Sequence, residues 1–169
     1  IQHLNPRHES SLPEILGKAT NMKVQTAENR QILQPDTLSV IPPGFSLSLR
    51  GRTLILEKRQ EAAGVFQPID RFFIAMAREL QEKAIAVVLS GSSSDGSKGV
   101  IEVRSAGGLT MAQSEETAEY SSMPRQALLT DKVDFCGSAA EIGRLLGDIA
   151  RHPHLYPDAL PESSSKEMD

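Results

Sequence analysis

The feature that most constrains the fold is a buried strand followed by a loop of small residues and then a helix. The apolar run AIAVVL at residues 84–89 is too short for a buried helix and is typical of a strand buried on both faces. It leads into the loop SGSSSDG at residues 90–96, and a helical pattern follows at residues 97–106. This order forms half of a βαβ unit. Because sites in open α/β sheets lie at the carboxyl ends of strands, the loop places Asp95 in a functional position.

The rest of the chain continues this alternation. From residue 69 onward, expected strands at 109–113 and 133–136 alternate with helices, which implies parallel strands joined by crossover helices. Short strands are expected at 24–27 and 38–41, and a β-hairpin at 46–50 and 53–57. We therefore expect an α/β fold with a doubly wound, mostly parallel sheet and an inserted β-hairpin. Residues 1–4 resemble the end of a strand, and the first strand of the sheet is expected to be missing from the chain.

Composition limits the classes of protein that fit. The net charge of −4 argues against a general nucleic-acid binder, and the 4% of aromatic residues argues against a stacking platform for single strands. There is no apolar stretch long enough to span a membrane, so no membrane insertion is expected. A single cysteine, Cys136, excludes an internal disulfide, fits a cytoplasmic location and is expected to be buried. We expect one domain at residues 1–151 and a tail or linker at 152–169.

Asp95 has three readings from its surroundings. Its carboxylate could cap the helix that follows, orient a catalytic histidine, or bind a metal. Metal binding is the weakest of these, because no second carboxylate or histidine is close in sequence. Asp70 is the expected N-cap of its own helix, and Ser138 is the expected N-cap of the last helix.

The serines of the loop fit none of the common catalytic motifs. Gly91 and the residues after it do not complete G-x-S-x-G, because Asp95 stands where the second glycine belongs. A phosphate-binding loop also fails, because Ser97 replaces the lysine. The backbone N–H groups of the loop could still form an oxyanion hole, and a solvated turn is the plain alternative.

Two further features are candidates for the same site. His3 stands at an expected strand end, where it could act as a general base with Asp95 as its orienting partner, or could simply be a surface histidine. Met123 and Pro124 could fix a rigid loop near the same sheet edge, although Pro124 is also typical of a first helical turn.

Several segments together resemble the catalytic domain of the chemotaxis receptor methylesterases, the CheB family. The order and spacing of the matching segments agree across nearly all of residues 1–150. The matches are IQHL at 1–4, VIPP at 40–43, VLSG at 88–91, Asp95-Gly96, Gly99, AGG at 106–108, AQ at 112–113, MPR at 123–125 and VDF at 133–135. Residues 3–10 and 117–120 look most like hybrids that also carry a receptor methyltransferase, and the tail would then link to that domain.

The resemblance implies a Ser-His-Asp triad that hydrolyses glutamyl methyl esters on chemoreceptor helices and can deamidate glutamine. By motif, the catalytic histidine falls on His3 and the catalytic aspartate on Asp95. We expect no cofactor and no metal ion. The family's oxyanion region falls on the loop that holds Gly91, Ser92 and Ser93 and on the neighbouring Met123 and Pro124.

This sequence departs from the family pattern in two places. The family's nucleophilic serine lies in a loop upstream of the histidine, and none of the serines here occupies that motif, so this chain alone is expected to be inactive. The family loop usually has glycine where Ser93 stands, so a side chain could crowd the oxyanion region or alter the turn. The alternatives to an ester hydrolase are an inactive signalling or scaffolding module of the same fold and an α/β domain that binds a small molecule at residues 90–96.

Overall fold

The computed structural model of the chain describes residues 11–59 and 67–152. His3 and nearly all of the expected tail lie outside the described residues. The helices are α1 (Leu12–Ala19), α2 (Pro68–Leu80), α3 (Ser97–Ser105), α4 (Ser122–Leu128) and α5 (Ala139–Arg151), with short 3₁₀ turns at Gln81–Lys83 and Glu115–Thr117. The strands are β1 (Lys23–Thr26), β2 (Thr37–Val40), β3 (Phe45–Arg50), β4 (Thr53–Lys58), β5 (Ile85–Val88), β6 (Leu109–Gln113) and β7 (Phe135–Gly137).

The central sheet contains β5, β6 and β7 in that order, and all three strands are parallel. Val88 pairs with Ala112, and Ala112 pairs with Cys136, so the three strands end at the same edge. This confirms the parallel arrangement expected from the alternation of strands and helices after residue 69.

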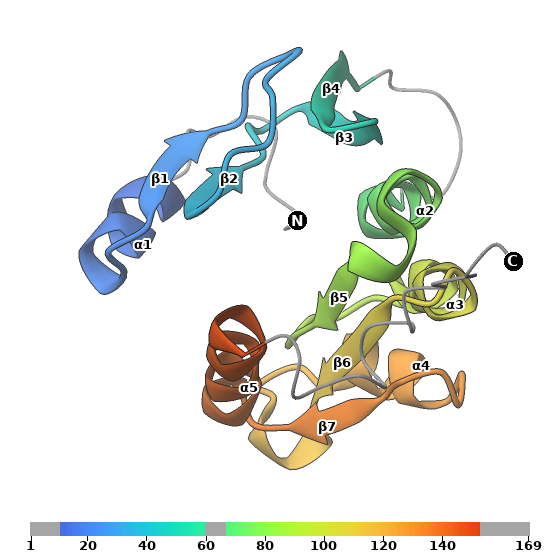
Figure 1. The fold of residues 1–169 in the computed structure, drawn as a ribbon. Coiled ribbons are helices and arrows are strands. Elements are labelled where there is room, and N and C mark those ends of the chain that lie inside the picture. The colour runs from blue at the N-terminus through green and yellow to red at the C-terminus, as the bar shows by residue number, and fades with distance from the viewer. Residues whose placement is uncertain (1–10, 60–66, 153–169) are drawn as a thin grey trace, which may run out of the picture.

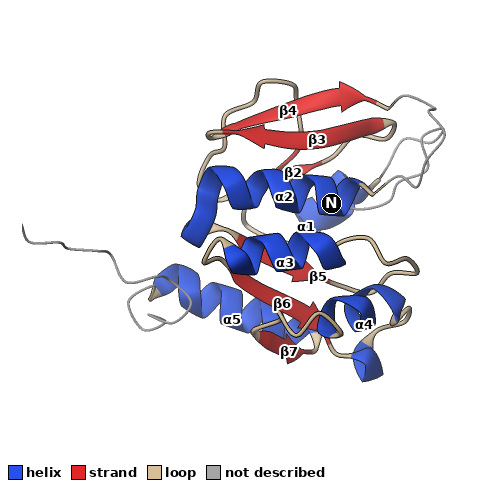
Figure 2. Ribbon diagram, turned by 90° about the vertical axis from the view of Figure 1, so that its right-hand side faces the viewer, coloured by secondary structure: helices blue, strands red, loops and turns tan. Residues whose placement is uncertain are grey.

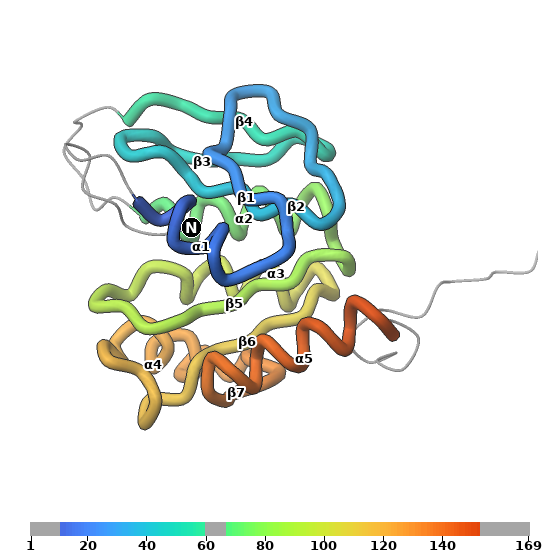
Figure 3. Tube along the Cα trace, turned by 90° about the vertical axis from the view of Figure 1, so that its left-hand side faces the viewer, coloured from blue at the N-terminus to red at the C-terminus, as the bar shows by residue number. Residues whose placement is uncertain are grey.

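Both faces of this sheet are covered by helices (Figures 1 and 2). Side chains alternate along each strand, so Ala86 and Val88 of β5 pack into the cluster of α2, α3 and α4. The intervening Ile85 and Val87 pack against the cluster that contains α5, which crosses the other face in Figure 3. A strand that is apolar on both faces is what a doubly wound sheet requires.

The first part of the chain forms two smaller sheets. β1 and β2 are parallel, with Val24 opposite Leu38. β3 and β4 form the expected antiparallel hairpin, whose register places Leu49 opposite Leu54. Both of these leucines belong to an apolar cluster against which Phe72 of α2 packs, so the hairpin is attached to the central helices through α2. Among the described helices, none is both long and apolar enough to cross a bilayer.

An apolar cavity of about 550 Å³ lies between β2 and β5. Its wall contains residues of α1, β2, β3, α2 and β5, and its polar lining residues are Ser39 and Ser90. Among the residues that the structure describes, those lining this cavity include no titratable side chain, and Ser90 joins its wall to the loop that follows β5.

The N-terminus of α5 has the cap that the sequence predicts. Ser138 caps α5 as expected, because its hydroxyl accepts from the N–H of Glu141 while the Glu141 carboxylate accepts from the N–H of Ser138. The prediction that Cys136 is buried is wrong, since its side chain is exposed. Phe135 packs toward α5, so the next side chain points to the opposite face, and because β7 is an edge strand the side chain of Cys136 stays exposed there.

Candidate active site

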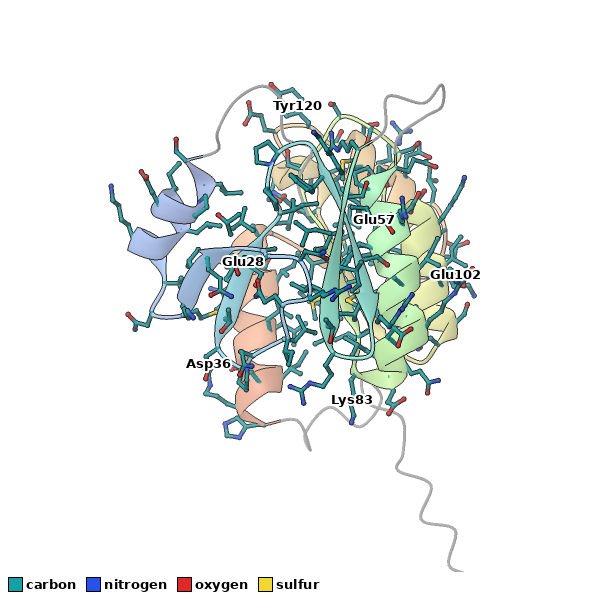
Figure 4. All side chains as sticks on the ribbon, turned by 90° about the horizontal axis from the view of Figure 1, so that it is seen from above. Glu28, Asp36, Glu57, Lys83, Glu102 and Tyr120 are labelled. Carbon is teal, nitrogen blue, oxygen red and sulfur yellow. The ribbon has the colours of Figure 1, made fainter. Side chains whose placement is uncertain are left out.

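The loop after β5 and the segment after β6 meet at the carboxyl edge of the central sheet. The N–H of Gly91 donates to the carbonyl of Tyr120 at 2.8 Å, and the N–H of Met123 donates to the carbonyl of Gly91 at 2.9 Å. The Ser90 hydroxyl accepts from the N–H of Tyr120 at 2.9 Å. Figure 4 shows Tyr120 and Lys83 at opposite ends of the molecule, which matches their positions beyond the two ends of the strands.

The side chain of Gln113, the last residue of β6, forms hydrogen bonds to both segments. Its Oε1 accepts from the N–H of Ser90 at 3.0 Å, and its Nε2 donates to the carbonyl of Thr117 at 2.9 Å. The side chain is buried, so these bonds replace those it would make with water. Sequence reasoning did not assign Gln113 a role, although a polar residue at the end of a buried strand is a usable signal.

Gly91 lies where the side chain of Met123, from the first turn of α4, covers the loop. A Cβ atom at this position would overlap Sδ of Met123, so the methionine side chain would have to move. Met123 and Pro124 are both buried, in the first turn of α4. The structure therefore brings together the predicted site residues Gly91 and Met123, and it places Pro124 beneath the surface of this edge.

Asp95 lies deep in the loop, with 2% of its surface exposed. Its Oδ2 accepts from the N–H of Ile69 at 3.0 Å and its Oδ1 accepts from the N–H of Asp70 at 2.8 Å. Pro68 has no N–H group, and the N–H of Arg71 already donates to the carbonyl of Gln67. Asp95 therefore satisfies the two remaining donors of the first turn of α2.

Asp70 performs the corresponding role for α3. Its Oδ1 accepts from the N–H of Gly96 at 3.0 Å and from the N–H of Gly99 at 2.7 Å. The N-cap position of α3 is Gly96, with φ of 104°, which has no side chain to cap the helix itself.

Asp95, which precedes α3, thus caps α2, and Asp70, which lies in α2, caps α3. The prediction that Asp70 caps its own helix is wrong, and so is the reading in which Asp95 caps the helix that follows it. The exchange is possible because α2 and α3 pack side by side, which brings their N-termini together.

The Asp70 carboxyl group sits in an unfavourable environment for a charge. Its Oδ2 is buried and has no hydrogen-bond partner among the described residues. Burial raises the pKa of Asp70, and the nearby charge of Asp95 raises it further, while the N–H groups of Gly99 and Gly96 and the charge of Lys98 oppose the rise.

The raised pKa of Asp70 predicts how stability depends on pH. Its contribution to the free energy of unfolding is fully present below the unfolded pKa of about 3.9 and is lost as the pH rises through the folded pKa. Asp70→Asn removes this titration, so its stability relative to the parent chain should increase as the pH rises above about 4. Urea unfolding measures the difference, with Asp148→Asn at an exposed ion pair as control. A stability difference that does not change with pH would contradict the prediction.

The serines of the loop have distinct surroundings. Ser92 is exposed, whereas Ser93 is half-buried and its Oγ accepts from the N–H of Asp95 at 3.1 Å. Ser93 does not have a positive φ, so its side chain causes no backbone strain, although the family usually has glycine there. Within residues 11–59 and 67–152, no acceptor is found for the N–H groups of Ser92 and Ser93.

The described residues contain no group of three His, Cys, Asp or Glu side chains that could hold a metal ion. His3 lies outside these residues, so its expected pairing with Asp95 stays a prediction. A carboxylate has about four acceptor positions, and the two N–H groups that donate to Asp95 are compatible with a third donor such as an imidazole.

Comparison with known proteins decides the family. The pattern that defines the CheB methylesterase family matches residues 1–146. The chain belongs to this family. The crystal structure of the Thermotoga maritima CheB methylesterase catalytic domain superposes with a TM-score of 0.78 at 25% identity, over 88% of this chain and 80% of that one. The α/β fold with a parallel sheet and covering helices is therefore the CheB fold.

Curated relatives of the CheB family agree with this assignment. A protein-glutamate methylesterase/protein-glutamine glutaminase of Myxococcus xanthus is 32% identical over 154 residues, which are 89% of this chain and 45% of that protein. An uncharacterised 104.1 kDa protein of Rhodobacter capsulatus is 38% identical over 145 residues, which are 85% of this chain and 15% of that protein. The chain thus spans less than half of either relative, and its family is one of carboxyl-ester hydrolases.

Proposed function

We propose that this domain hydrolyses glutamyl methyl esters on chemoreceptor helices and deamidates glutamine there, using a Ser-His-Asp triad. His3 and Asp95 would be the histidine and the aspartate. The relatives named protein-glutamate methylesterase/protein-glutamine glutaminase support this choice of substrate.

The observation that carries the proposal is the fixed position of Asp95. Two backbone N–H groups hold its carboxylate at the carboxyl edge of a parallel sheet, where sites of this fold class lie. Such a carboxylate can hold an imidazole in one tautomer and stabilise the imidazolium that forms during the reaction.

The reaction follows from these roles. The serine hydroxyl attacks the ester carbonyl, and His3 accepts its proton and gives it to the departing methanol. Water then attacks the acyl-enzyme, again with His3 as base, and releases the glutamate carboxylate. With glutamine as substrate, the same steps release ammonia in place of methanol.

We assign the oxyanion hole, the set of donors that binds the negatively charged oxygen, to the loop at residues 91–93. The N–H groups of Ser92 and Ser93 have no acceptor among the described residues and lie just after β5, so they could donate to the developing charge. The bonds that Gln113 and Tyr120 make to Ser90 and Gly91 keep this loop in one conformation. A preorganised donor costs no reorganisation when the charge forms.

The attacking serine is not assigned to the described loop. The hydroxyl of Ser90 accepts from the backbone N–H of Tyr120, and the hydroxyl of Ser93 accepts from the backbone N–H of Asp95. We therefore assign both hydroxyls a structural role. We assign the nucleophile to a family-type serine loop N-terminal to Ile1. A receptor methyltransferase domain in the same polypeptide is a further part of the proposal, supported by the 104.1 kDa relative, in which the matched segment is 15% of the chain.

The test is methanol release from methylated chemoreceptor. A chain extended upstream with a family-type serine loop should release methanol, and the 169-residue chain should not. Replacement of the added serine by alanine in the longer chain is the matched control and should abolish release. If the longer chain binds receptor but releases no methanol, the domain is an inactive scaffolding module and the proposal is wrong.

A further inference from the structure

We propose that Asp70 is a positioning residue for the reaction, because it holds Asp95 and the loop that carries Asp95 in place at the same time. The inference rests on the proposed function, since it assumes that Asp95 belongs to the triad.

The argument starts from a closed ring of hydrogen bonds. The backbone N–H of Asp70 donates to Oδ1 of Asp95 at 2.8 Å. In return, Oδ1 of Asp70 accepts from the N–H of Gly96, the residue directly after Asp95, at 3.0 Å. The main chain of Asp70 therefore binds the carboxylate of Asp95, and its side chain binds the backbone of the next residue, Gly96.

The ring extends into α3 through Gly99, whose N–H donates to Asp70 at 2.7 Å. With glycine at the N-cap position, α3 has no cap of its own at that position, and Asp70 takes this role. Loss of the Asp70 carboxyl group would leave two buried N–H groups unpaired and release the start of α3. The backbone of Asp95 would then shift, and its carboxylate would shift with it.

The Asp70 side chain is 3% exposed and does not reach solvent as a general acid or base would. All of its hydrogen bonds are to backbone groups of the loop and α3, and the groups that face it by charge are Asp95 and Lys98. Its effect on catalysis would therefore pass through Asp95, which makes it a positioning residue and not a catalytic one.

Two variants separate geometry from charge. Asp70→Asn removes the charge but keeps an oxygen that can accept from Gly96 and Gly99, whereas Asp70→Ala removes the acceptor as well. In the extended chain, Asp70→Ala should lower kcat about 100-fold, the size expected for a displaced catalytic group, and should change KM by less than about threefold. Asp70→Asn should restore kcat to within about fivefold of the parent chain. If Asp70→Ala does not fold, Asp70→Ser takes its place, since the serine hydroxyl ends one bond short of the carboxylate oxygen.

A spectroscopic measurement on the 169-residue chain gives an independent readout. The ring N–H of His3 bonded to Asp95 should give a low-field proton resonance in the parent chain and in Asp70→Asn. It should be absent in Asp70→Ala and in Asp95→Ala. If the resonance is absent in the parent chain, or persists in Asp95→Ala, the pairing of His3 with Asp95 is wrong and the inference falls with it. If Asp95→Ala loses the resonance while Asp70→Ala keeps both it and kcat, only the positioning role of Asp70 is wrong.

Discussion

Asp95→Asn is expected to lower kcat for ester hydrolysis by about 10⁴-fold in a chain that carries the nucleophile, as loss of the triad aspartate does in serine hydrolases. An amide has one acceptor oxygen and one donor nitrogen. At this position the oxygen can serve either Ile69 or Asp70, and the nitrogen then faces the other N–H group. The amide can therefore neither satisfy both N–H groups nor hold the imidazole in the productive tautomer.

The same substitution separates catalysis from binding. Because the triad aspartate acts in the transition state, KM should change far less than kcat. Asp148→Asn, which breaks an exposed pair with Arg151 on α5, is the matched control and should leave both constants unchanged. A loss of less than about tenfold in kcat for Asp95→Asn would remove Asp95 from the triad.

Asp95→Ala should also destabilise the fold, which distinguishes its two roles. It leaves the N–H groups of Ile69 and Asp70 without an acceptor, and each buried unpaired donor costs about 1–3 kcal/mol. We therefore expect a loss of about 4 kcal/mol in the free energy of unfolding, measured by urea denaturation. No loss of stability would show that the two donors find other acceptors.

The sheet was predictable because its signals are local. The run at residues 84–89 is apolar at every position, and the structure forms β5 within it. The hairpin was predictable for a similar reason, since two alternating segments flank Gly51-Arg52, and the observed register pairs Arg50 with Thr53. The capping box at Ser138 needs only residues three apart, which a linear pattern contains.

The exchange of caps between Asp70 and Asp95 could not be predicted in the same way. The residues that bond are 25 or more positions apart, and their approach depends on how closely α2 packs against α3. The burial of Asp95 could not be predicted from its neighbours in the sequence, because a loop of small polar residues is typical of an exposed turn. The pairing with His3 was inferred from family resemblance and stays a prediction.

Gly99→Ala is expected to destabilise the fold by about 3 kcal/mol, the upper range for overpacking a well-packed core. A Cβ atom at residue 99 would overlap Cβ of Phe73 and would lie 2.9 Å from its Cδ2. The Cβ of Phe73 is bonded to the backbone of α2, so no change of rotamer can move it away. The contact can be relieved only if α2 and α3 separate.

Separation of these helices would also stretch the bond from the N–H of Gly99 to Asp70, so the capping ring would loosen with the core. A loss of about 3 kcal/mol corresponds to a fall of about 6–12 °C in Tm for a domain of this size. Gly143→Ala is the matched control, because it lies within α5 and a Cβ there meets nothing within 4 Å. Alanine should stabilise that helix by about 0.5–1 kcal/mol, so the two substitutions are expected to shift Tm in opposite directions. A Tm that is unchanged or raised in Gly99→Ala would mean that the helices are not packed as closely as these distances require.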